Sequence, residues 1–347
     1  MRMADLFRKQ ASACADLGSP LYAGLLDLLA DDIEAGGVSV AVLAGHEDDP
    51  GPSALALRLL GSVHRLVLNG RAPELAAFYP SAGGDWGLRA GWRAFENLLR
   101  TRPDEVREWL DRPPQTNEVG RASALMGGLL RVGESFRLPV RLLEIGASGG
   151  LNLRADRYFY TGQDGFRHGH PDSPVRLEGA WQGSPLTAWP DLRIVERLGC
   201  DVMPVDVSSE DGRLTLMSYV WPDQTVRFER LLGAIEVARG LPVEVRRQDA
   251  VSFVRDIELV PTTTTVLWHS VMWQYLSAED RAAVMSRIDE LGAAATSDMP
   301  FAHLFLEPTR RTPASDHEFL VVLQLWPEGE RRILGTSVGH GIPTTWE

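Results

Sequence analysis

Cysteine is scarce in this sequence, and that scarcity limits the class of protein it can encode. Among 347 residues, Cys14 and Cys200 are the two cysteines. No CxxC pair is present and no histidine cluster has metal-ligand spacing, which argues against a disulfide framework and a structural zinc site. We therefore predict no bound metal and a reducing, cytoplasmic environment.

Long apolar runs and concentrated positive charge are missing as well. The stretch MRMADLFRKQASACADLG at the N-terminus carries scattered charges instead of the apolar core of a signal peptide. No apolar run approaches the roughly 20 residues of a membrane-spanning helix. The formal net charge is −12 and no Lys/Arg-rich tract occurs, so neither a membrane nor a nucleic acid is an expected partner. A small-molecule substrate is expected, and the oligomeric state is left open.

The sequence does have a globular composition and a change of pattern near residue 138. Hydrophobic residues make up 44% and charged residues 24%, which is enough for a sizeable core. Helical patterns dominate before that point, for example after Pro20 and after the possible N-cap Ser53, and predict a helical domain at 1–137. The segment VSVAVLAG, residues 38–45, fits either a strand or a buried helix.

Strand-like and helical runs alternate after residue 138, which predicts an α/β domain at 138–347 with a doubly wound, mostly parallel sheet. The strand-like runs include VRLLEIG, VEVRRQ, TTTTVLWHSV and FAHLFLEP. The chain closes with EFLVVLQLW, the turn PEGE and RRILGTSVG, which must pair antiparallel because the turn is tight. Residues 161–221 fit the alternation badly and are interpreted as an elaborated insertion around the second strand.

The stretch RLLEIGASGG, residues 141–150, carries the most informative motif and allows two interpretations. G-x-S-x-G is the nucleophile elbow of serine hydrolases, with Ser148 as the nucleophile, although an elbow normally follows several strands. Alternatively, Glu144 precedes a glycine-rich turn at a strand end, where the backbone can approach a cofactor. The dinucleotide fingerprint G-x-G-x-x-G is not met, because Ser148 and Leu151 replace two of its glycines.

The pattern E-x-G-x-S-x-G resembles the first motif of class I S-adenosylmethionine-dependent methyltransferases. The resemblance covers residues 138–336 and rests on the order of several short motifs. It implies that the turn formed by Glu144, Gly146, Ser148 and Gly150 packs against the methionine part of S-adenosylmethionine. The fold it implies is Rossmann-like, with an antiparallel last strand.

Two later acidic residues extend this resemblance. Asp201 in LGCDVMP matches the acidic residue that holds the ribose hydroxyls at the end of the second strand. Asp206 and Glu178 are alternatives for that role. Asp249 and Ala250 follow VEVRRQ and match the third motif, whose acidic residue contacts the adenine amino group.

A narrower resemblance spans nearly the whole chain. TNEVGR, LLEIGASGGLNLRADRYFY, VWPDQTVR and HSVMWQYL together resemble a bacterial family that is labelled a domain of unknown function and is related to those methyltransferases. It implies an N-terminal helical region, a Rossmann-like domain and S-adenosylmethionine as cofactor. The expected activity is methylation of a small molecule or an exposed protein group. A non-catalytic cofactor-binding or interaction protein is the alternative.

Polar residues near the strand ends are candidates for the substrate side. His269 follows an apolar strand, where a neutral imidazole could take a proton from the methyl acceptor, or could be a core residue. Asp223 and Arg227, four residues apart on a helix, could reach a polar substrate, or Asp223 could cap that helix. The expected lining of the substrate pocket is Glu118, Arg121, Ser270, Gln274 and Tyr275.

Overall fold

The computed structural model describes residues 2–49 and 53–347, and the chain forms two compact units. Unit 1 consists of Met1–Thr116 and Ser209–Glu229, and unit 2 of Asn117–Ser208 and Arg230–Glu347. The division after Glu229 falls within helix α10 (Thr225–Gly240).

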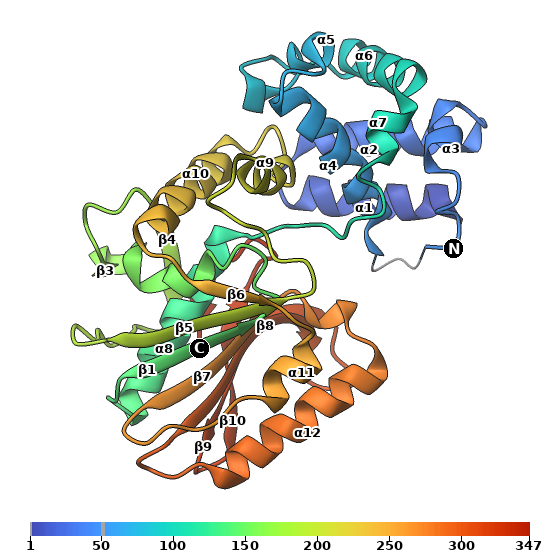
Figure 1. Cartoon of the computed structure of the whole chain (residues 1–347). Coiled ribbons are helices and arrows are strands. Elements are labelled where there is room, and N and C mark those ends of the chain that lie inside the picture. The colour runs from blue at the N-terminus through green and yellow to red at the C-terminus, as the bar shows by residue number, and fades with distance from the viewer. Residues whose placement is uncertain (1, 50–52) are drawn as a thin grey trace. The chain divides into compact units, whose positions relative to one another are not determined.

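Unit 1 is built from helices (Figure 1). They are α1 (Met3–Asp16), α2 (Pro20–Glu34), α3 (Val38–Leu43), α4 (Leu55–Leu68), α5 (Pro73–Ala76), η2 (Pro80–Ala82), α6 (Leu88–Thr101), α7 (Pro103–Arg107) and α9 (Glu210–Ser218). The ambiguous segment VSVAVLAG therefore contains a helix, α3. Its N-terminus is stabilised because the Ser39 N–H donates to Asp32 Oδ2 at 2.8 Å.

The predicted helix starts in unit 1 have different outcomes. Ser19 caps α2, since its Oγ accepts the Tyr22 N–H at 3.2 Å and Pro20 occupies the first helical position. The prediction for Ser53 is wrong. α4 begins one residue later, with Ala54 at its N-cap in a left-handed conformation at φ 54°.

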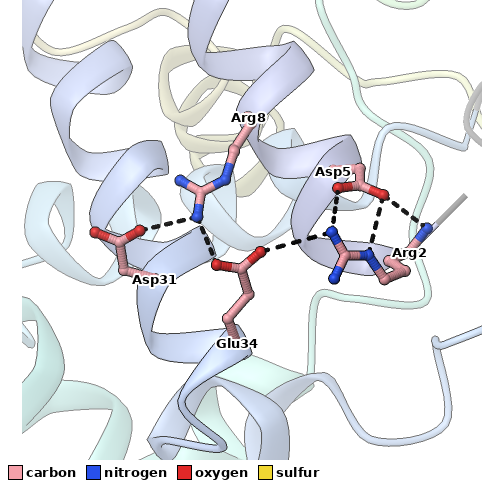
Figure 2. Close-up of polar contacts among 5 residues, drawn as sticks. All are labelled: Arg2, Asp5, Arg8, Asp31 and Glu34. Carbon is pink, nitrogen blue, oxygen red and sulfur yellow. Dashed lines mark hydrogen bonds and ion pairs between the residues drawn. The ribbon is translucent and has the colours of Figure 1, made fainter.

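Helices α1 and α2 are joined by an apolar core and a surface ion-pair cluster. Arg8 of α1 donates to Asp31 at 2.9 Å and to Glu34 at 2.7 Å, both on α2, as Figure 2 shows. Exposed pairs of this kind contribute about 0–1 kcal/mol each. Burial of Phe7 and Leu25, both 0% exposed, supplies more, because a fully buried large apolar side chain contributes about 1.5–3 kcal/mol.

Unit 2 is a mixed α/β structure around a large, mostly parallel sheet. Its strands are β1 (Val140–Ile145), β2 (Phe159–Gly162), β3 (Arg167–Gly169), β4 (Arg176–Gly183), β5 (Ile194–Asp201), β6 (Glu244–Arg247), β7 (Thr264–Ser270), β8 (Phe301–Arg310), β9 (His317–Trp326), β10 (Glu330–Ser337) and β11 (Thr344–Trp346). Its helices, besides part of α10, are η3 (Val119–Arg121), α8 (Ala122–Ser135), η4 (Asn152–Arg157), η5 (Gln163–Gly165), α11 (Ala250–Arg255), η6 (Trp273–Tyr275) and α12 (Ala278–Ala294).

The strand order is β3-β2-β4-β11-β10-β9-β8-β7-β1-β5-β6. β6, β5, β1, β7 and β8 are parallel to one another, which confirms the predicted, mostly parallel sheet. The closing pair β9 and β10 is antiparallel, as predicted. β9 is also antiparallel to β8 and follows it without an intervening helix, so β8, β9 and β10 form a meander.

The poorly patterned segment 161–221 is only partly an elaboration of the sheet. Strands β2, β3 and β4 form the edge of the sheet beyond β11. β5 pairs directly with β1, and is therefore a central strand. The last part of the segment, which contains α9, belongs to unit 1.

The two faces of the sheet are covered by different helices. α12 packs against β8 and β9 and contacts α11, and Leu143 and Leu267 lie in the apolar core on this side. α8 lies on the opposite face, where Gly128 approaches Leu304 closely. Trp268 pairs in register with Leu304 on one side and with Glu144 on the other. Because residues in register on parallel strands point to the same face, the side chains of Glu144, Trp268 and Leu304 all lie on the face that α8 covers.

Candidate functional site

The turn after β1 is held in an unusual backbone conformation. Gly146, Ser148 and Gly150 have φ values of 71°, 51° and 66°, and such a conformation costs a non-glycine residue about 1 kcal/mol or more. The Ser148 N–H donates to Asp201 Oδ2 at 2.9 Å, and Asp201 Oδ1 accepts the Met203 N–H at 2.9 Å. Asp201 therefore joins the end of β5 to the turn, and the two predicted elements of the cofactor site lie together.

Glu144 is the buried acidic residue at the end of β1. Its side chain is on the face of the sheet that α8 covers, and the residue is 2% exposed. Burial raises the pKa of Glu144 to about 8, and the nearby Asp201 carboxylate also raises it. Glu144 Oε2 has no hydrogen-bond partner among the described residues. Because an unsatisfied buried polar atom is costly, this carboxyl is a candidate ligand-binding group.

The segment before α8 fixes the chain that follows the turn. Asn117 Oδ1 accepts the Leu151 N–H at 3.0 Å, and the Glu118 carbonyl accepts Asn152 Nδ2 at 3.3 Å. Glu118 is the N-cap of η3, since its Oε1 accepts the Gly120 N–H at 3.0 Å. This helix start therefore contacts the chain that follows the glycine turn, and the Glu118 side chain, expected to line the substrate pocket, caps η3.

A buried network at the ends of β7 and β8 was not predicted. His269 Nδ1 lies 2.8 Å from Glu307 Oε1, and His269 Nε2 lies 3.0 Å from His303 Nε2. Glu307 Oε1 also accepts the N–H groups of Met272 at 3.0 Å and Trp273 at 3.2 Å. The sequence did contain a signal, because two polar residues stand four apart in the apolar strand FAHLFLEP and alternation places them on one face.

This network changes the interpretation of His269. A carboxylate is an acceptor, so His269 Nδ1 donates to Glu307, while His269 Nε2 shares a hydrogen bond with His303 Nε2. Burial, together with the nearby His269, holds the pKa of His303 well below its usual range, so His303 stays neutral. Both nitrogens of His269 are engaged and the residue is 2% exposed, so a role as a free general base does not fit this geometry. It also lies on the sheet face opposite to Glu144.

The other residues expected near the end of β7 have varied environments. Arg121 donates to the backbone oxygens of Gly339 at 3.0 Å and Ser270 at 3.3 Å, which joins β7 to the loop after β10. Ser270 is buried, whereas Gln274 and Tyr275 are exposed. Arg121 and Ser270 are therefore positioned by tertiary contacts, and the two exposed residues remain predictions for substrate contact.

The structure also shows where the other residues predicted to contact the ribose and the adenine lie. Glu178 lies on β4, which β11, β10, β9, β8 and β7 separate from β1, so it cannot serve the turn after β1. Asp206 is exposed beyond β5, and its Oδ1 accepts the Ser208 N–H at 2.9 Å. Asp249 is the N-cap of α11, where the Ser252 N–H bonds to it at 2.8 Å and lowers the pKa of its carboxyl. Ala250 begins that helix.

Asp223 and Arg227 belong to unit 1, and Asp223 stabilises a helix start there. The Asp223 carboxylate accepts Ser19 Oγ–H at 2.7 Å and the Leu21 N–H at 3.0 Å, both at the N-terminus of α2. Arg227 bonds to Gln224, and its guanidinium lies 5.4 Å from the centroid of the Trp221 ring. The prediction that Asp223 caps the helix that follows it is therefore wrong, because its carboxylate stabilises the start of α2.

Replacing Asp223 by alanine is expected to lower the thermal unfolding temperature. The Ser19 hydroxyl and the Leu21 N–H would lose a charged acceptor, at a cost of about 1–3 kcal/mol. Calorimetry on this variant and on Asp16→Ala, an exposed position on α1, measures the difference. An unchanged unfolding temperature for Asp223→Ala would contradict the capping role.

Comparison with known families identifies the chain without assigning an activity. The family described as "Uncharacterized protein conserved in bacteria (DUF2332)" matches residues 4–346. The chain belongs to this family. The predicted membership of a bacterial family of unknown function is therefore confirmed, while the link to methyltransferases stays a prediction. Searches of curated proteins and of solved structures gave no match.

Two further observations describe this DUF2332 chain. Within residues 2–49 and 53–347, no three His, Cys, Asp or Glu side chains are grouped as a metal ion would require. In the same part of the chain, every helix is too short or too polar to span a bilayer.

Proposed function

We propose that this protein binds S-adenosylmethionine in unit 2, at the carboxyl ends of β1 and β5, and catalyses methyl transfer. The observation that carries the proposal is the buried Glu144 carboxyl, whose Oε2 has no partner among the described residues, beside a turn that Asp201 fixes. Ligands of doubly wound sheets bind at the carboxyl ends of the strands. The resemblance of the motif to the methyltransferase family supplies the identity of the cofactor.

The chemistry of these residues fits S-adenosylmethionine. The cofactor has a positively charged amino group and a sulfonium, and Glu144 would be the carboxylate that balances the amino group. The positive φ of Gly146 turns the backbone away from β1, and the absence of a side chain would let the cofactor approach the backbone of the turn closely. Asp201 would hold the ribose diol through a carboxylate that already accepts two backbone N–H groups.

The chain's own part in the reaction would be binding and orientation. S-adenosylmethionine, when bound, supplies a methyl group that its sulfonium already activates. The protein would need to hold the acceptor in line and to exclude water. His269 and Glu307 would act by position, since Glu307 fixes the backbone of Met272 and Trp273. Because Gly146 lies against Met272, this network supports the turn from the neighbouring strand.

Isothermal titration of the full chain with S-adenosylmethionine and with its demethylated product tests the proposal. Wild type is expected to bind both, and Asp201→Ala is expected to bind about 10- to 100-fold more weakly, because hydrogen bonds to a charged group are worth about 1.5–3 kcal/mol. Glu178→Gln, an exposed change on β4, is the control and should leave the affinity unchanged. No binding of either compound to wild type would exclude the proposal.

A labelled-methyl assay separates an enzyme from a non-catalytic binder on the same fold. Incorporation of the label into a small molecule or a protein acceptor supports methyl transfer. Cofactor binding with no incorporation into any candidate acceptor favours the non-catalytic alternative.

The serine hydrolase alternative keeps one supporting observation, which is the positive φ of Ser148. A nucleophile elbow also holds its serine in a strained turn between a strand and a helix. Here the turn is followed by the 3-10 helix η4. Labelling of wild type, but not of Ser148→Ala, by a fluorophosphonate would favour the hydrolase over the methyltransferase.

A further inference from the structure

A basic groove lies at the amino-terminal end of β5, away from the site proposed above. It encloses about 690 Å³ within unit 2, which is a usual size for a small-molecule site. The charged residues that line it are Asp156, Arg157, Arg167, Arg193 and Arg197. Ile194 begins β5 and Asp201 ends it, so the groove and the cofactor turn are separated by roughly 20 Å of strand.

Arg197, which lines the basic groove, is held by hydrogen bonds within unit 2. The Arg197 guanidinium forms a bidentate pair with Asp156, at 2.6 and 2.7 Å, and also donates to the Leu153 carbonyl at 2.6 Å. Its side chain is 8% exposed. Trp189, which is 3% exposed, adds an apolar surface. The paired Arg197 is therefore a fixed part of the groove, and its charge is balanced by Asp156.

The remaining arginines give the basic groove an excess of positive charge. Arg157, Arg167 and Arg193 are exposed. Arg157 Nε lies 3.3 Å from the already paired Asp156. Arg167 and Arg193 make no hydrogen bond or ion pair with any side chain that the structure describes. Four arginines and one carboxylate leave an excess of three positive charges around this groove, in a chain whose net charge is −12.

We infer that the basic groove binds a small molecule that carries phosphate groups. Guanidinium groups remain charged at every physiological pH and bind phosphate oxygens through two parallel hydrogen bonds. An excess of three positive charges suits a ligand with at least two negative charges better than a monocarboxylate. The volume of about 690 Å³ suits a small molecule, whereas a nucleic acid or an acidic peptide would need an extended surface.

Titration of the full chain with inorganic pyrophosphate tests this inference. The Arg167→Gln/Arg193→Gln double variant removes the two unpaired guanidinium groups and is expected to weaken pyrophosphate binding at least tenfold. The Arg246→Gln/Arg255→Gln variant changes the net charge equally at exposed positions outside the groove and should bind like wild type. The affinity should also fall as the ionic strength rises.

Three outcomes would overturn the inference. The first is that wild type does not bind pyrophosphate. The second is that the two double variants bind pyrophosphate equally. The third is that a short oligonucleotide or polyglutamate, but not pyrophosphate, binds to wild type and binds less well to the Arg167→Gln/Arg193→Gln variant. Because S-adenosylmethionine is titrated separately, its failure to bind would leave this result unaffected.

Discussion

At pH 8 the Glu144→Gln variant is expected to be more stable than the wild-type protein. The pKa of Glu144 is raised from 4.5 to about 8 in the folded chain, mainly by burial. Between these two values the folded state holds a proton that the unfolded state has released. The stability of the wild type therefore falls as the pH rises from about 4.5 to 8.

Glutamine has the shape of the protonated acid and stays neutral, so the variant avoids this loss. Each unit of pKa shift corresponds to about 1.4 kcal/mol, which sets an upper bound of about 5 kcal/mol on the gain at pH 8. Below pH 4.5 both side chains are neutral in both states, and the two proteins should have similar stability.

Unfolding temperatures of both proteins at pH 5 and pH 8 measure the effect. The difference between variant and wild type should grow by several degrees from pH 5 to pH 8. Glu178→Gln, at an exposed position on β4, should show no such growth. A constant difference at both pH values would mean that Glu144 titrates near its ordinary pKa.

The same substitution tests whether Glu144, which destabilises the folded protein, binds the cofactor. If Glu144 binds the amino group of the cofactor, Glu144→Gln should gain stability and lose affinity for S-adenosylmethionine. Such an exchange of stability for activity is common at binding sites. A stabilised variant that binds the cofactor like wild type would leave Glu144 without a role in the proposed function.

Local patterns in the sequence predicted much of unit 2. The run VRLLEIG forms β1, and Ser277 caps α12, since its Oγ accepts the Asp280 N–H at 3.0 Å. The closing pair β9 and β10 was predicted from the short turn between them. These features depend on neighbouring residues, and alternation, capping chemistry and loop length act over a few positions.

Features that depend on distant partners were not predicted. The sequence predicted Glu144 for the cofactor turn and His269 for the substrate side, but it did not show that their side chains lie on opposite faces of the sheet. The segment Ser209–Glu229 joins unit 1 although it follows β5. The role of Glu307 depends on His269, 38 residues away, and the alternation in FAHLFLEP marks Glu307 without identifying that partner.

Replacing Glu307 by alanine is expected to destabilise the protein by about 3–5 kcal/mol. The substitution removes the acceptor of three N–H groups, from the buried His269 and the partly buried Met272 and Trp273, and leaves them without that partner. Glu307→Gln keeps an amide oxygen that can accept the same bonds, so it should cost less. Glu318→Ala removes a partly exposed ion pair with Arg311, in the turn after β8, and should cost at most about 1 kcal/mol.

Unfolding in urea and the NMR signal of the His269 ring N–H together test the network. In wild type the Nδ1 proton should be protected from exchange, because His269 is 2% exposed and donates to Glu307. Glu307→Ala should lose that signal and Glu307→Gln should retain it. A protected signal in Glu307→Ala would show that another group fixes the His269 ring, and the backbone of Met272 and Trp273 would then not depend on Glu307. Loss of the signal together with unchanged stability would instead mean that water replaces the carboxylate at little cost.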